Sequence, residues 1–570
     1  MAARGDVTGT EFDAIVVGSG ITGGWAAKEL TERGLKTLVL ERGKPLVHGR
    51  DYVGEHRPPW EVPFRGLPLR ELYAHDYPVQ SKSYAFDENT RHFWNNDREN
   101  PYQQDEEAPF DWMRADVVGG RSLLWGRQVY RWSDLDFTAN RADGHGVDWP
   151  IRYADLAPWY AHVERFVGVS GEKLGLPQLP DGEFLRPMEL NVVERAFARA
   201  LKEHFPGRVC TIGRVAVLTE PLPGQDRGVC HYCGPCHRGC SVGAYFSSLS
   251  ATLPAAQATG NLTLRPRSVV DSLEHDPHTG RVTAVRVVDA DAKARLRFTA
   301  RLVFLCGGTV GSTQILLNSR SERFPNGLGN GSGALGRYLM DHTSLVHVTG
   351  RFDGFDEYYP TGYRPNGIYI PRFRNLRPDE ALPFVRGYGF QGEAWRADWR
   401  QMSRQPGFGA DFKRSLRRPG PWYLRLMGFG ECLPYATNYV ELHPTAVDRY
   451  GIPQVRFHFE WGANELAQRR DMLEQARAML AAAGARDIEG GDFNAWGGAA
   501  IHEMGTARMG RDPRESVLNG FNQCHEVSNL FVTDGACMAS SSCVNPSITY
   551  MALTARAVDY AVQRLRDGSL

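Results

Sequence analysis

The stretch FDAIVVGSGITGGWAAKELTERGLKTLVLERG, residues 12–43, decides the fold of this chain. Residues 12–17 form a short apolar run that is typical of a buried strand. Gly18, Gly20 and Gly23 follow with the spacing G-x-G-x-x-G. A helical segment comes next, and then a second apolar run at residues 37–40. The order strand, tight turn, helix, strand predicts a Rossmann-like α/β domain.

The three glycines have separate roles in such a unit. The first allows the turn, the second lets the backbone approach a pyrophosphate, and the third lets the helix pack close to the strand. The helix N-terminus then presents free N–H groups and a positive dipole end to the phosphates. Glu41 ends the second strand, where its carboxylate is placed to accept hydrogen bonds from a ribose. This context predicts a dinucleotide site rather than a Gly-rich turn in an unrelated unit, and it leaves FAD and NAD both open.

The rest of the chain indicates that this domain is discontinuous. The apolar run 302–306, followed by two glycines, predicts a strand that returns to the first sheet, with a helix at STQILLNS, residues 312–319. Residues 340–460 carry alternating runs between long loops, which predicts an antiparallel sheet. A helix is expected from Asn464 as its N-cap to Gly484 as its stop, and another at the C-terminus with Pro546 in its first turn.

Length and composition limit the remaining possibilities. A chain of 570 residues is too long for one small core. Its 66 basic and 66 acidic residues give a formal net charge of +0, which favours neither nucleic acid nor a membrane surface as a partner. No apolar run reaches the about 20 residues that a membrane span needs. The residues before the first strand also lack the pattern of a signal peptide.

Four of the ten cysteines, Cys230, Cys233, Cys236 and Cys240, fall in CHYCGPCHRGC, residues 230–240. Neighbours this close gain little from a disulfide cross-link, and structural zinc usually takes two cysteine pairs that a longer segment separates. The spacing matches the cysteine run of bacterial ferredoxins, although Ser241 follows where those proteins have proline. An iron–sulfur cluster is therefore favoured, with zinc and a reduced structural loop as alternatives.

Four segments together resemble the glucose–methanol–choline (GMC) oxidoreductases, a family of FAD enzymes. They are GSGITG at 18–23, GGRS at 119–122, HEMGTARMG at 502–510 and LFVTDGACMASSSCVNPSITYMALTARAVDYA at 530–561. The resemblance implies bound FAD, oxidation of an alcohol, and an FAD-binding domain beside a substrate domain built on a mainly antiparallel sheet. The FAD domain is expected mainly over residues 1–330, with the cysteine loop inserted at about 225–245, and the substrate domain over 331–490. Residues 491–570 are expected to return to the FAD domain.

The resemblance also implies particular site residues. The catalytic pair of the family, a His followed by a His or Asn, corresponds to His502 and Asn545. Asp534 and Gly535 match a pair that contacts the flavin side of FAD, and Val270 matches a position whose backbone touches the adenine. The remaining implied FAD contacts are Gly18, Gly20, Gly23, Glu41, Gly119, Gly120, Ser122, Trp125, Asn545 and Pro546. Some relatives attach FAD covalently through a His that here is Leu124, so non-covalent FAD is expected.

Alcohol oxidation requires a base within hydrogen-bond reach of the hydroxyl group, while flavin chemistry takes the hydride. A histidine suits this task because its pKa lies near neutrality. We therefore assign His502 as the base and Asn545 as the partner that fixes the hydroxyl. Asn545 also precedes the C-terminal helix, whose positive end could lie near the flavin pyrimidine ring.

Within this family the chain resembles one subgroup more closely, the large subunits of bacterial sugar dehydrogenases, because they carry a cysteine loop of this kind. In those relatives a three-iron (3Fe–4S) cluster is held by three cysteines with the spacing of Cys230, Cys236 and Cys240. The resemblance therefore favours a three-iron cluster here. Cys233 is an additional candidate ligand, which leaves a four-iron cluster open. The resemblance implies a cytochrome c acceptor and a small export or chaperone subunit with a twin-arginine signal. It therefore implies a periplasmic location, with the cytoplasm as the alternative.

The sequence is most similar to glucoside 3-dehydrogenases, which oxidise the C3 hydroxyl of glucosides and disaccharides to 3-keto sugars. Dehydrogenation of glucose, fructose or gluconate at another carbon, an oxygen-using sugar oxidase, and a flavin and iron–sulfur electron carrier remain as alternatives. Substrate contacts are expected near Gln391, Gly392, Glu393 and Trp395, because amides and carboxylates bind hydroxyls and aromatic faces stack on sugar rings. Those residues could equally belong to the sheet core or surface.

Overall fold

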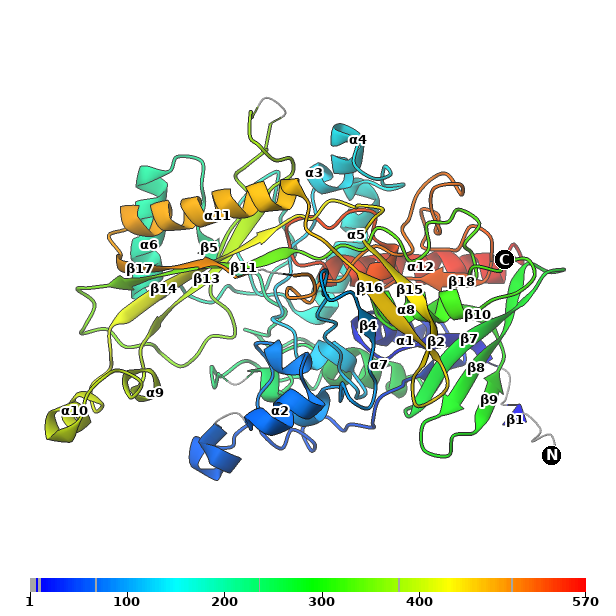
Figure 1. The fold of residues 1–570 in the computed structure, drawn as a ribbon, viewed down its shortest axis with the longest axis horizontal. Helices are drawn as coiled ribbons and strands as arrows, with labels where there is room; N and C mark the ends of the chain where they lie inside the picture. The colour runs from blue at the N-terminus through cyan, green and yellow to red at the C-terminus, as the bar shows by residue number, and fades with distance from the viewer. Residues whose placement is uncertain (1–6, 9–11, 67–68, 235, 378–379, 494–495) are drawn as a thin grey trace.

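The computed structural model describes residues 7–8, 12–66, 69–234, 236–377, 380–493 and 496–570. A five-stranded parallel sheet has the order β18-β10-β2-β3-β6 (Figure 1). The strands are Leu530–Val532, Ala300–Leu305, Phe12–Val17, Thr37–Leu40 and Leu262–Arg265 in that order. The strands predicted at 12–17 and 37–40 are confirmed. The run predicted at 302–306 also returns to the sheet, next to β2.

Helices cover this sheet and explain why its strands are almost entirely apolar. Helix α1, Ile21–Glu32, connects β2 to β3 and packs on α12, Ser547–Arg566. Helix α12 packs in turn on α5, Tyr153–Val167, while α7, Leu253–Ala258, contacts α1. Helix α8, Thr309–Asn318, follows β10 where a helix is expected. The N-terminal and C-terminal segments of the chain therefore share one layer.

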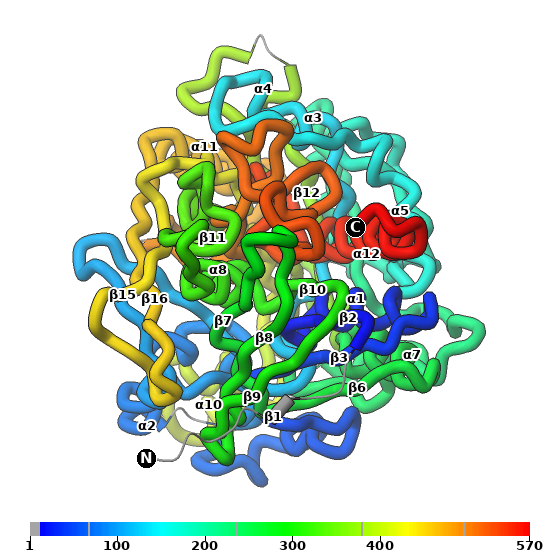
Figure 2. Tube along the Cα trace, turned by 90° about the vertical axis from the view of Figure 1, so that its right-hand side faces the viewer, coloured from blue at the N-terminus to red at the C-terminus, as the bar shows by residue number. Residues whose placement is uncertain are grey.

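Two smaller sheets accompany the parallel sheet. Strands β7, Ser268–Asp276, β8, Arg281–Asp289, and β9, Arg295–Phe298, form an antiparallel meander beside it (Figure 2). Strand β1, Val7–Thr8, pairs with β9 in parallel. Strands β15, Tyr439–Val447, and β16, Pro453–His458, form a hairpin, and β4, Gln103–Gln104, extends it.

A six-stranded antiparallel sheet lies at the opposite end of the molecule in Figure 1. Its order is β17-β11-β14-β13-β12-β5, with bounds Arg486–Asp492, Thr343–Phe352, Trp422–Gly430, Tyr388–Arg396, Ile368–Ile370 and Thr211–Ile212. Helices α11, Ala463–Ala482, and α6, Val192–His204, pack on this sheet. The expected α/β architecture with a second, mainly antiparallel sheet is confirmed.

Helix α11 differs from the prediction at its start. Gly462, not Asn464, is the N-cap residue. Asn464 lies within the first turn, where its side-chain oxygen accepts a hydrogen bond of 2.8 Å from the Val385 backbone N–H. The Asn464 side chain, which the sequence pattern assigned to cap its own helix, therefore bonds Val385 of another segment instead. At the other end Gly484 follows the helix with φ of +80°, as expected for a stop residue.

Short helices occupy the connections. They are α2, Arg70–Asp76, α3, Asp134–Phe137, α4, Ala139–Asp143, α9, Trp399–Met402, and α10, Gly409–Ser415. No described helix combines the length and the apolar character that crossing a membrane requires.

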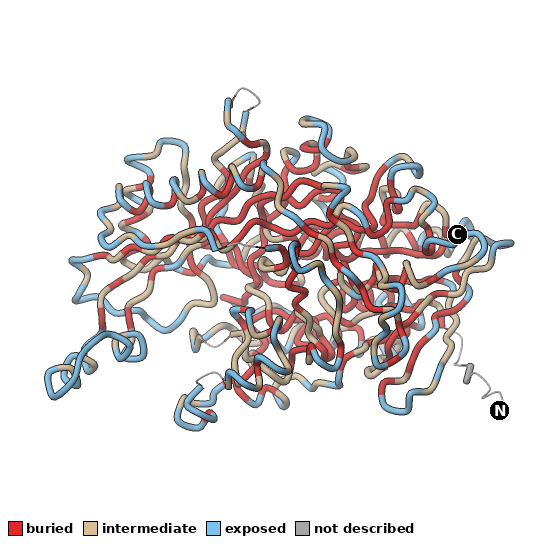
Figure 3. Tube along the Cα trace, viewed as in Figure 1, coloured by how far each residue is buried: buried red, intermediate tan, exposed pale blue. Residues whose placement is uncertain are grey.

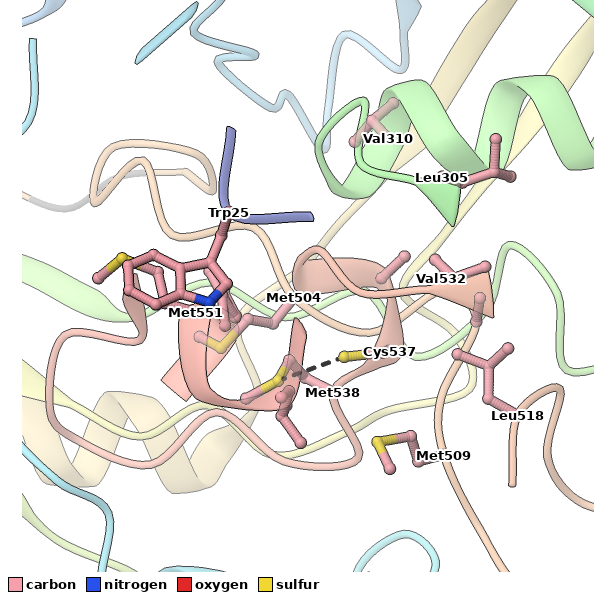
Figure 4. Packing of buried hydrophobic residues seen from close by; sticks show 14 of the residues in the cluster. Trp25, Leu305, Val310, Met504, Met509, Leu518, Val532, Cys537, Met538 and Met551 are labelled. Atoms are coloured by element: carbon pink, nitrogen blue, oxygen red, sulfur yellow. Dashed lines mark hydrogen bonds between the residues drawn. The ribbon is translucent and has the colours of Figure 1, made fainter. Parts of the chain in front are cut away.

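The buried residues concentrate between the sheets and their helices, while the α9–α10 connection is exposed (Figure 3). The largest buried cluster joins Trp25 of α1 and Met551 of α12 to Met504 and Met509 (Figure 4). Burying a side chain of this size contributes about 1.5–3 kcal/mol. Met504 and Met509 are fully buried, so they hold the segment that directly follows His502.

Candidate active site

One cavity of about 690 Å³ extends from the glycine turn of β2–α1 to the six-stranded sheet. Its lining includes residues from both ends of the chain and from β11, β13 and β14. The volume lies within the about 300–1,000 Å³ that is usual for ligand pockets. The cavity therefore has room for a nucleotide cofactor and lies where the two main sheets meet.

The three glycines of the first turn meet different surroundings. Gly18 has φ of +97°, and an added Cβ would lie 2.5 Å from the Cys306 carbonyl oxygen. A Cβ on Gly23 would lie 2.0 Å from the Gly18 oxygen, so only glycine lets α1 approach β2 this closely. A Cβ on Gly20 would meet nothing within 4 Å, because Gly20 faces the cavity. Gly20 is also the N-cap of α1 and makes no side-chain cap, which leaves the first amides of the helix for an anion.

Glu41 lies at the end of β3 and lines the same cavity. Its carboxylate accepts hydrogen bonds from the Ser19 N–H at 2.9 Å, the Ser19 hydroxyl at 2.6 Å and the Gly43 N–H at 2.7 Å. Burial nevertheless raises the pKa of Glu41 above its usual value. The carboxylate thus stabilises the glycine turn as well as facing the predicted ribose position.

The second glycine turn, Gly119–Ser122, lies against the first. The Gly119 N–H donates to the Ser19 hydroxyl at 2.9 Å, and Gly119 has φ of +93°. Arg121 lines the cavity and donates two hydrogen bonds, of 2.9 and 2.7 Å, to the carboxylate of Glu503. This bidentate pair connects the turn to the residue after His502.

Most of the residues predicted to contact FAD line this cavity. Those that do are Gly18, Gly20, Glu41, Gly120, Ser122, Trp125, Val270, Asp534, Gly535, Asn545 and Pro546. Gly23 and Gly119 do not; they pack against the neighbouring turns instead. The hydroxyl of Tyr550, in the first turns of α12, is buried beside the cavity and has no hydrogen-bond partner among the described residues.

His502 lines the cavity beside the six-stranded sheet, with the Phe429 ring of β14 at a centroid distance of 6.1 Å. Its Nδ1 lies 2.9 Å from Nδ1 of His342, and its backbone N–H donates to Asp341 at 3.0 Å. Burial lowers the pKa of His502 well below its usual value, and the nearby His342 and Arg121 lower it further. The ring is therefore neutral and able to accept a proton at neutral pH.

Asn545 lines the same cavity just before α12. Its side-chain oxygen accepts a hydrogen bond of 2.7 Å from the Gln391 amide, so its own amide N–H groups are left to act as donors. Asp534 accepts from the Ser312 hydroxyl at 2.5 Å and from the Ala536 N–H at 3.0 Å. Burial raises the pKa of Asp534 to about 6.

The six-stranded sheet lines the other side of the cavity with polar groups. Gln391 and Glu393 come from β13 and Arg425 from β14, and Arg425 donates to Glu393 at 2.6 Å. Gln128, His347 and Asn366 also line the cavity. Gly392 is part of this lining as well. Trp395 is not; its ring stacks on Tyr423, so the structure does not bring it to the cavity.

Family models of the GMC oxidoreductases match residues 12–344 and 434–554. The chain belongs to the GMC oxidoreductase family. 2-Methyl-1,2-propanediol dehydrogenase from Mycolicibacterium austroafricanum is 30% identical over 98% of this chain and 96% of its own length. The fructose dehydrogenase large subunit from Gluconobacter japonicus is 25% identical over 98% of each chain.

Solved structures confirm the fold. A variant of formate oxidase from Aspergillus oryzae, studied for its FAD modification, superposes with a TM-score of 0.61. The superposition covers 99% of this chain and 100% of that one at 15% sequence identity. This GMC oxidoreductase is therefore an FAD enzyme that acts on CH–OH groups.

The residues of the cavity fit FAD. Gly20 leaves open space where a side chain would project, the α1 amides have no side-chain cap, and the Tyr550 hydroxyl has no hydrogen-bond partner within the described part of the chain. Leu124, the position of a covalent His in some relatives, is an apolar buried residue and offers no nucleophile.

The cysteine loop of this GMC oxidoreductase lies on a separate, smaller cavity. Cys230, Cys233, Cys236 and Cys240 all line it, but its volume is about 20 Å³, enough for one water molecule. Within the described residues, which exclude residue 235, no group of three or more His, Cys, Asp or Glu side chains is arranged to hold a metal ion. The four cysteines are thus brought together, but their geometry does not support a formed cluster site.

A short chain of aromatic and charged groups separates the two cavities. The Tyr245 hydroxyl donates to the Trp125 carbonyl at 3.0 Å, and the Arg127 guanidinium lies 3.4 Å from the centre of the Tyr245 ring. Trp125 and Arg127 line the large cavity, and Tyr245 lines the small one.

Sequence reasoning missed Arg121, Glu503, His342 and Asp341. Arg121 lies within the GGRS segment and Glu503 follows His502, so the motifs contained a signal for both. His342 and Asp341 lie in no quoted motif, and their contacts to His502 span 160 and 161 residues.

Proposed function

We propose that this GMC oxidoreductase is an FAD-dependent sugar dehydrogenase that oxidises a secondary hydroxyl, the C3 hydroxyl of a glucoside or disaccharide. The observation that carries the proposal is the polar lining of β13 and β14 next to Asn545, to which Gln391 of β13 donates a hydrogen bond. Gln391, Glu393 and Arg425 offer donors and acceptors to several hydroxyl groups at once. A substrate with several hydroxyl groups can bind to these side chains, which otherwise bond Asn545, in the case of Gln391, or each other, in the case of Arg425 and Glu393.

In this proposal His502 takes the hydroxyl proton, and Asn545 orients the hydroxyl through its amide N–H. The O–H bond breaks as an N–H bond forms on the His502 ring. Bound FAD would supply the acceptor for the hydride that leaves the substrate carbon, and the product would be a ketone. The buried surroundings of His502 keep the ring neutral before the reaction. The Asn545 amide, as donor, and the His502 ring, as acceptor, together hold the reacting carbon of the substrate in one orientation.

The proposal includes an iron–sulfur centre at the cysteine loop as the exit for electrons, with three irons rather than four. Support comes from the cysteine spacing and from the convergence of the four cysteines next to Trp125, Arg127 and Tyr245, although their cavity of about 20 Å³ must widen to hold a cluster. Burial raises the pKa of Cys236 to about 12, so its bare thiol is protonated and metal binding must release the proton. The proposed acceptor is a cytochrome c-type protein, and the proposed location is the periplasm, reached with a small export subunit.

Product analysis tests the substrate. The purified enzyme is incubated with maltose, lactose, glucose, fructose or gluconate and an artificial acceptor, and the oxidised carbon is identified by nuclear magnetic resonance. The 3-keto product from a disaccharide supports the proposal, while oxidation of glucose, fructose or gluconate at another carbon replaces it. Oxidation of 2-methyl-1,2-propanediol in place of any sugar would favour a small-diol dehydrogenase, the activity named for the relative with 30% identity.

The base is tested with His502→Ala. We expect bound FAD to be retained and turnover to fall by about 10²–10⁴-fold, the usual contribution of a positioned acid–base group. Turnover like that of the unchanged protein would exclude His502 as the base.

Anaerobic addition of substrate tests the remaining alternatives. Loss of flavin absorbance followed by an electron paramagnetic resonance signal supports the dehydrogenase with a cluster. Loss of absorbance without any cluster signal, and without iron and sulfide in the protein, favours an oxygen-using oxidase. No loss of absorbance with any alcohol favours an electron carrier.

A further inference from the structure

His342 lies directly behind His502 and has no role in the mechanism so far. It precedes β11 and its side chain is fully buried. Its Nδ1 lies 2.9 Å from Nδ1 of His502, and its Nε2 lies 3.0 Å from the backbone carbonyl oxygen of Ser541. Both ring nitrogens of His342 therefore have one defined partner each.

The Ser541 contact determines where the protons lie. A carbonyl oxygen only accepts, so His342 must carry a proton on Nε2 and donate it. In a neutral ring the lone pair then lies on Nδ1. A lone pair at this position requires a donor from His502, and His502 must carry its own proton on Nδ1. The other His502 nitrogen, Nε2, is left with a lone pair.

Burial supports the neutral form of His342. It lowers the pKa of His342 to about 4, so the ring is uncharged at neutral pH. Phe429 packs on both imidazole rings, at centroid distances of 6.5 Å from His342 and 6.1 Å from His502. The charged groups next to His502 are Arg121, which is paired with Glu503, and Asp341, which accepts from its backbone.

Asp341 fixes the backbone of the same segment. Its carboxylate accepts from the His502 N–H at 3.0 Å and from the Ala500 N–H at 3.1 Å. The neighbouring residues Asp341 and His342 thus hold the main chain and the ring of His502 at the same time. Rotation of the His502 ring would break the hydrogen bond to His342, so the ring direction and the proton position are coupled.

We propose that His342 is a positioning residue that fixes His502 with its proton on Nδ1 and its lone pair on Nε2, where the cavity and the substrate hydroxyl lie. The proposal rests on the assignment of His502 as the base. When His502 accepts the hydroxyl proton on Nε2, the ring becomes a cation and its Nδ1–H bond to the neutral His342 strengthens. Because His342 is itself uncharged at neutral pH, it stabilises the cationic His502 ring through this hydrogen bond, whereas a charged His342 would repel that ring.

Two substitutions separate proton positioning from packing. In His342→Gln the amide can accept from His502 and donate to Ser541, while in His342→Leu neither bond is possible. We expect kcat to fall by about 10²-fold in His342→Leu, at the lower end of what a positioned base contributes, and by less than about tenfold in His342→Gln. KM should change much less than kcat in both, because neither substitution touches the substrate-facing groups.

The measurements use the FAD-loaded enzyme. The rate of flavin reduction is followed by rapid mixing across pH, and the FAD content and melting temperature are recorded for every variant. His525→Leu and His525→Gln serve as matched controls, because His525 is a half-buried histidine that bonds Ser516 away from the cavity. Both controls should reduce flavin at the unchanged rate.

The outcomes decide the proposal. The proposal is supported if kcat is largely kept in His342→Gln and the acid limb of the pH profile of flavin reduction shifts in His342→Leu. Equal loss in both variants with an unchanged pH profile would show that His342 only fills space. Unchanged reduction in His342→Leu would overturn the proposal while leaving the base intact, provided that His502→Ala is inactive. Activity in His502→Ala would instead overturn the proposed function.

Spectroscopy of the unsubstituted enzyme gives an answer even where His342→Leu fails to fold. Nitrogen chemical shifts of the ¹⁵N-histidine-labelled holoenzyme, assigned by comparison with His502→Ala, report which ring nitrogen carries the proton. A protonated Nδ1 on His502 is the expected result, and a protonated Nε2 at neutral pH would refute the proposal.

Discussion

Alanine substitution at Gly20 should act mainly on cofactor binding, whereas alanine substitution at Gly23 should act mainly on folding. Gly20 has φ of −66°, which alanine adopts without strain, and its added Cβ meets nothing within 4 Å. Gly20→Ala should therefore cost at most about 1 kcal/mol in folding, from the weaker helix cap. The methyl group instead projects into the cavity where the phosphates are expected. An overpacking cost of about 1–3 kcal/mol there corresponds to an about 5–150-fold weaker Kd for FAD.

Gly23→Ala should act on folding itself. The new Cβ would lie 2.0 Å from the Gly18 oxygen, whereas ordinary contacts begin at 3.4 Å, so α1 must move by roughly the difference. Forcing a methyl group into a packed site of this kind costs about 1–3 kcal/mol. FAD binding should weaken as well, because the helix N-terminus moves with the helix.

Urea unfolding of the FAD-free protein and titration with FAD measure the two effects separately. Gly520→Ala is the matched control, because its Cβ would meet only Pro150, at 3.5 Å, and neither residue lines the cavity. An unchanged Kd for FAD in Gly20→Ala would refute the assignment of this turn to the phosphates. An unchanged unfolding midpoint in Gly23→Ala would refute the packing argument.

Three further predictions follow from individual residues. Arg386→Met leaves the buried carboxylate of Glu431 without its partner and should lower the free energy of unfolding by about 3–5 kcal/mol; a loss below about 1 kcal/mol in urea unfolding would contradict this. The base must be neutral to accept a proton, and the pKa of His502 lies below 6.5, so kcat/KM should hold its plateau as pH falls to 6.5 and decrease only at lower pH. An acid limb at or above pH 6.5 in rapid-mixing reduction would argue against the buried base. Because Leu124 cannot form a covalent link, acid precipitation should release all the FAD into the supernatant, and a yellow pellet would disprove non-covalent binding.

Local sequence patterns predicted the elements whose causes are local. The strands at residues 12–17 and 37–40 were confirmed at those bounds, since a short apolar run between turn residues specifies a buried strand. The glycine turn was predicted equally well from the sequence, because Gly18 requires a positive φ and Gly23 lets helix α1 approach strand β2 closely. The segments around His502 and Asn545 indicated the GMC family, and both residues line the cavity.

Tertiary contacts decided what the patterns could not contain. The expected cap at Asn464 was wrong because Val385, distant in sequence, offers its N–H to that side chain. The cysteine spacing favoured a cluster, yet whether sulfur atoms converge depends on how the loop folds onto its neighbours, and here the shared cavity is small.

The sequence by itself determined the nucleotide fold, the family and the two cavity-lining residues that we propose for catalysis, because these depend on motifs within short segments. Only the tertiary structure decided how those residues are held. The Arg121 pair with Glu503 spans 382 residues, the Gln391 bond to Asn545 spans 154, and the His342 bond to His502 spans 160. No local periodicity carries information about partners this far apart, since their contact exists only once the sheets have packed together.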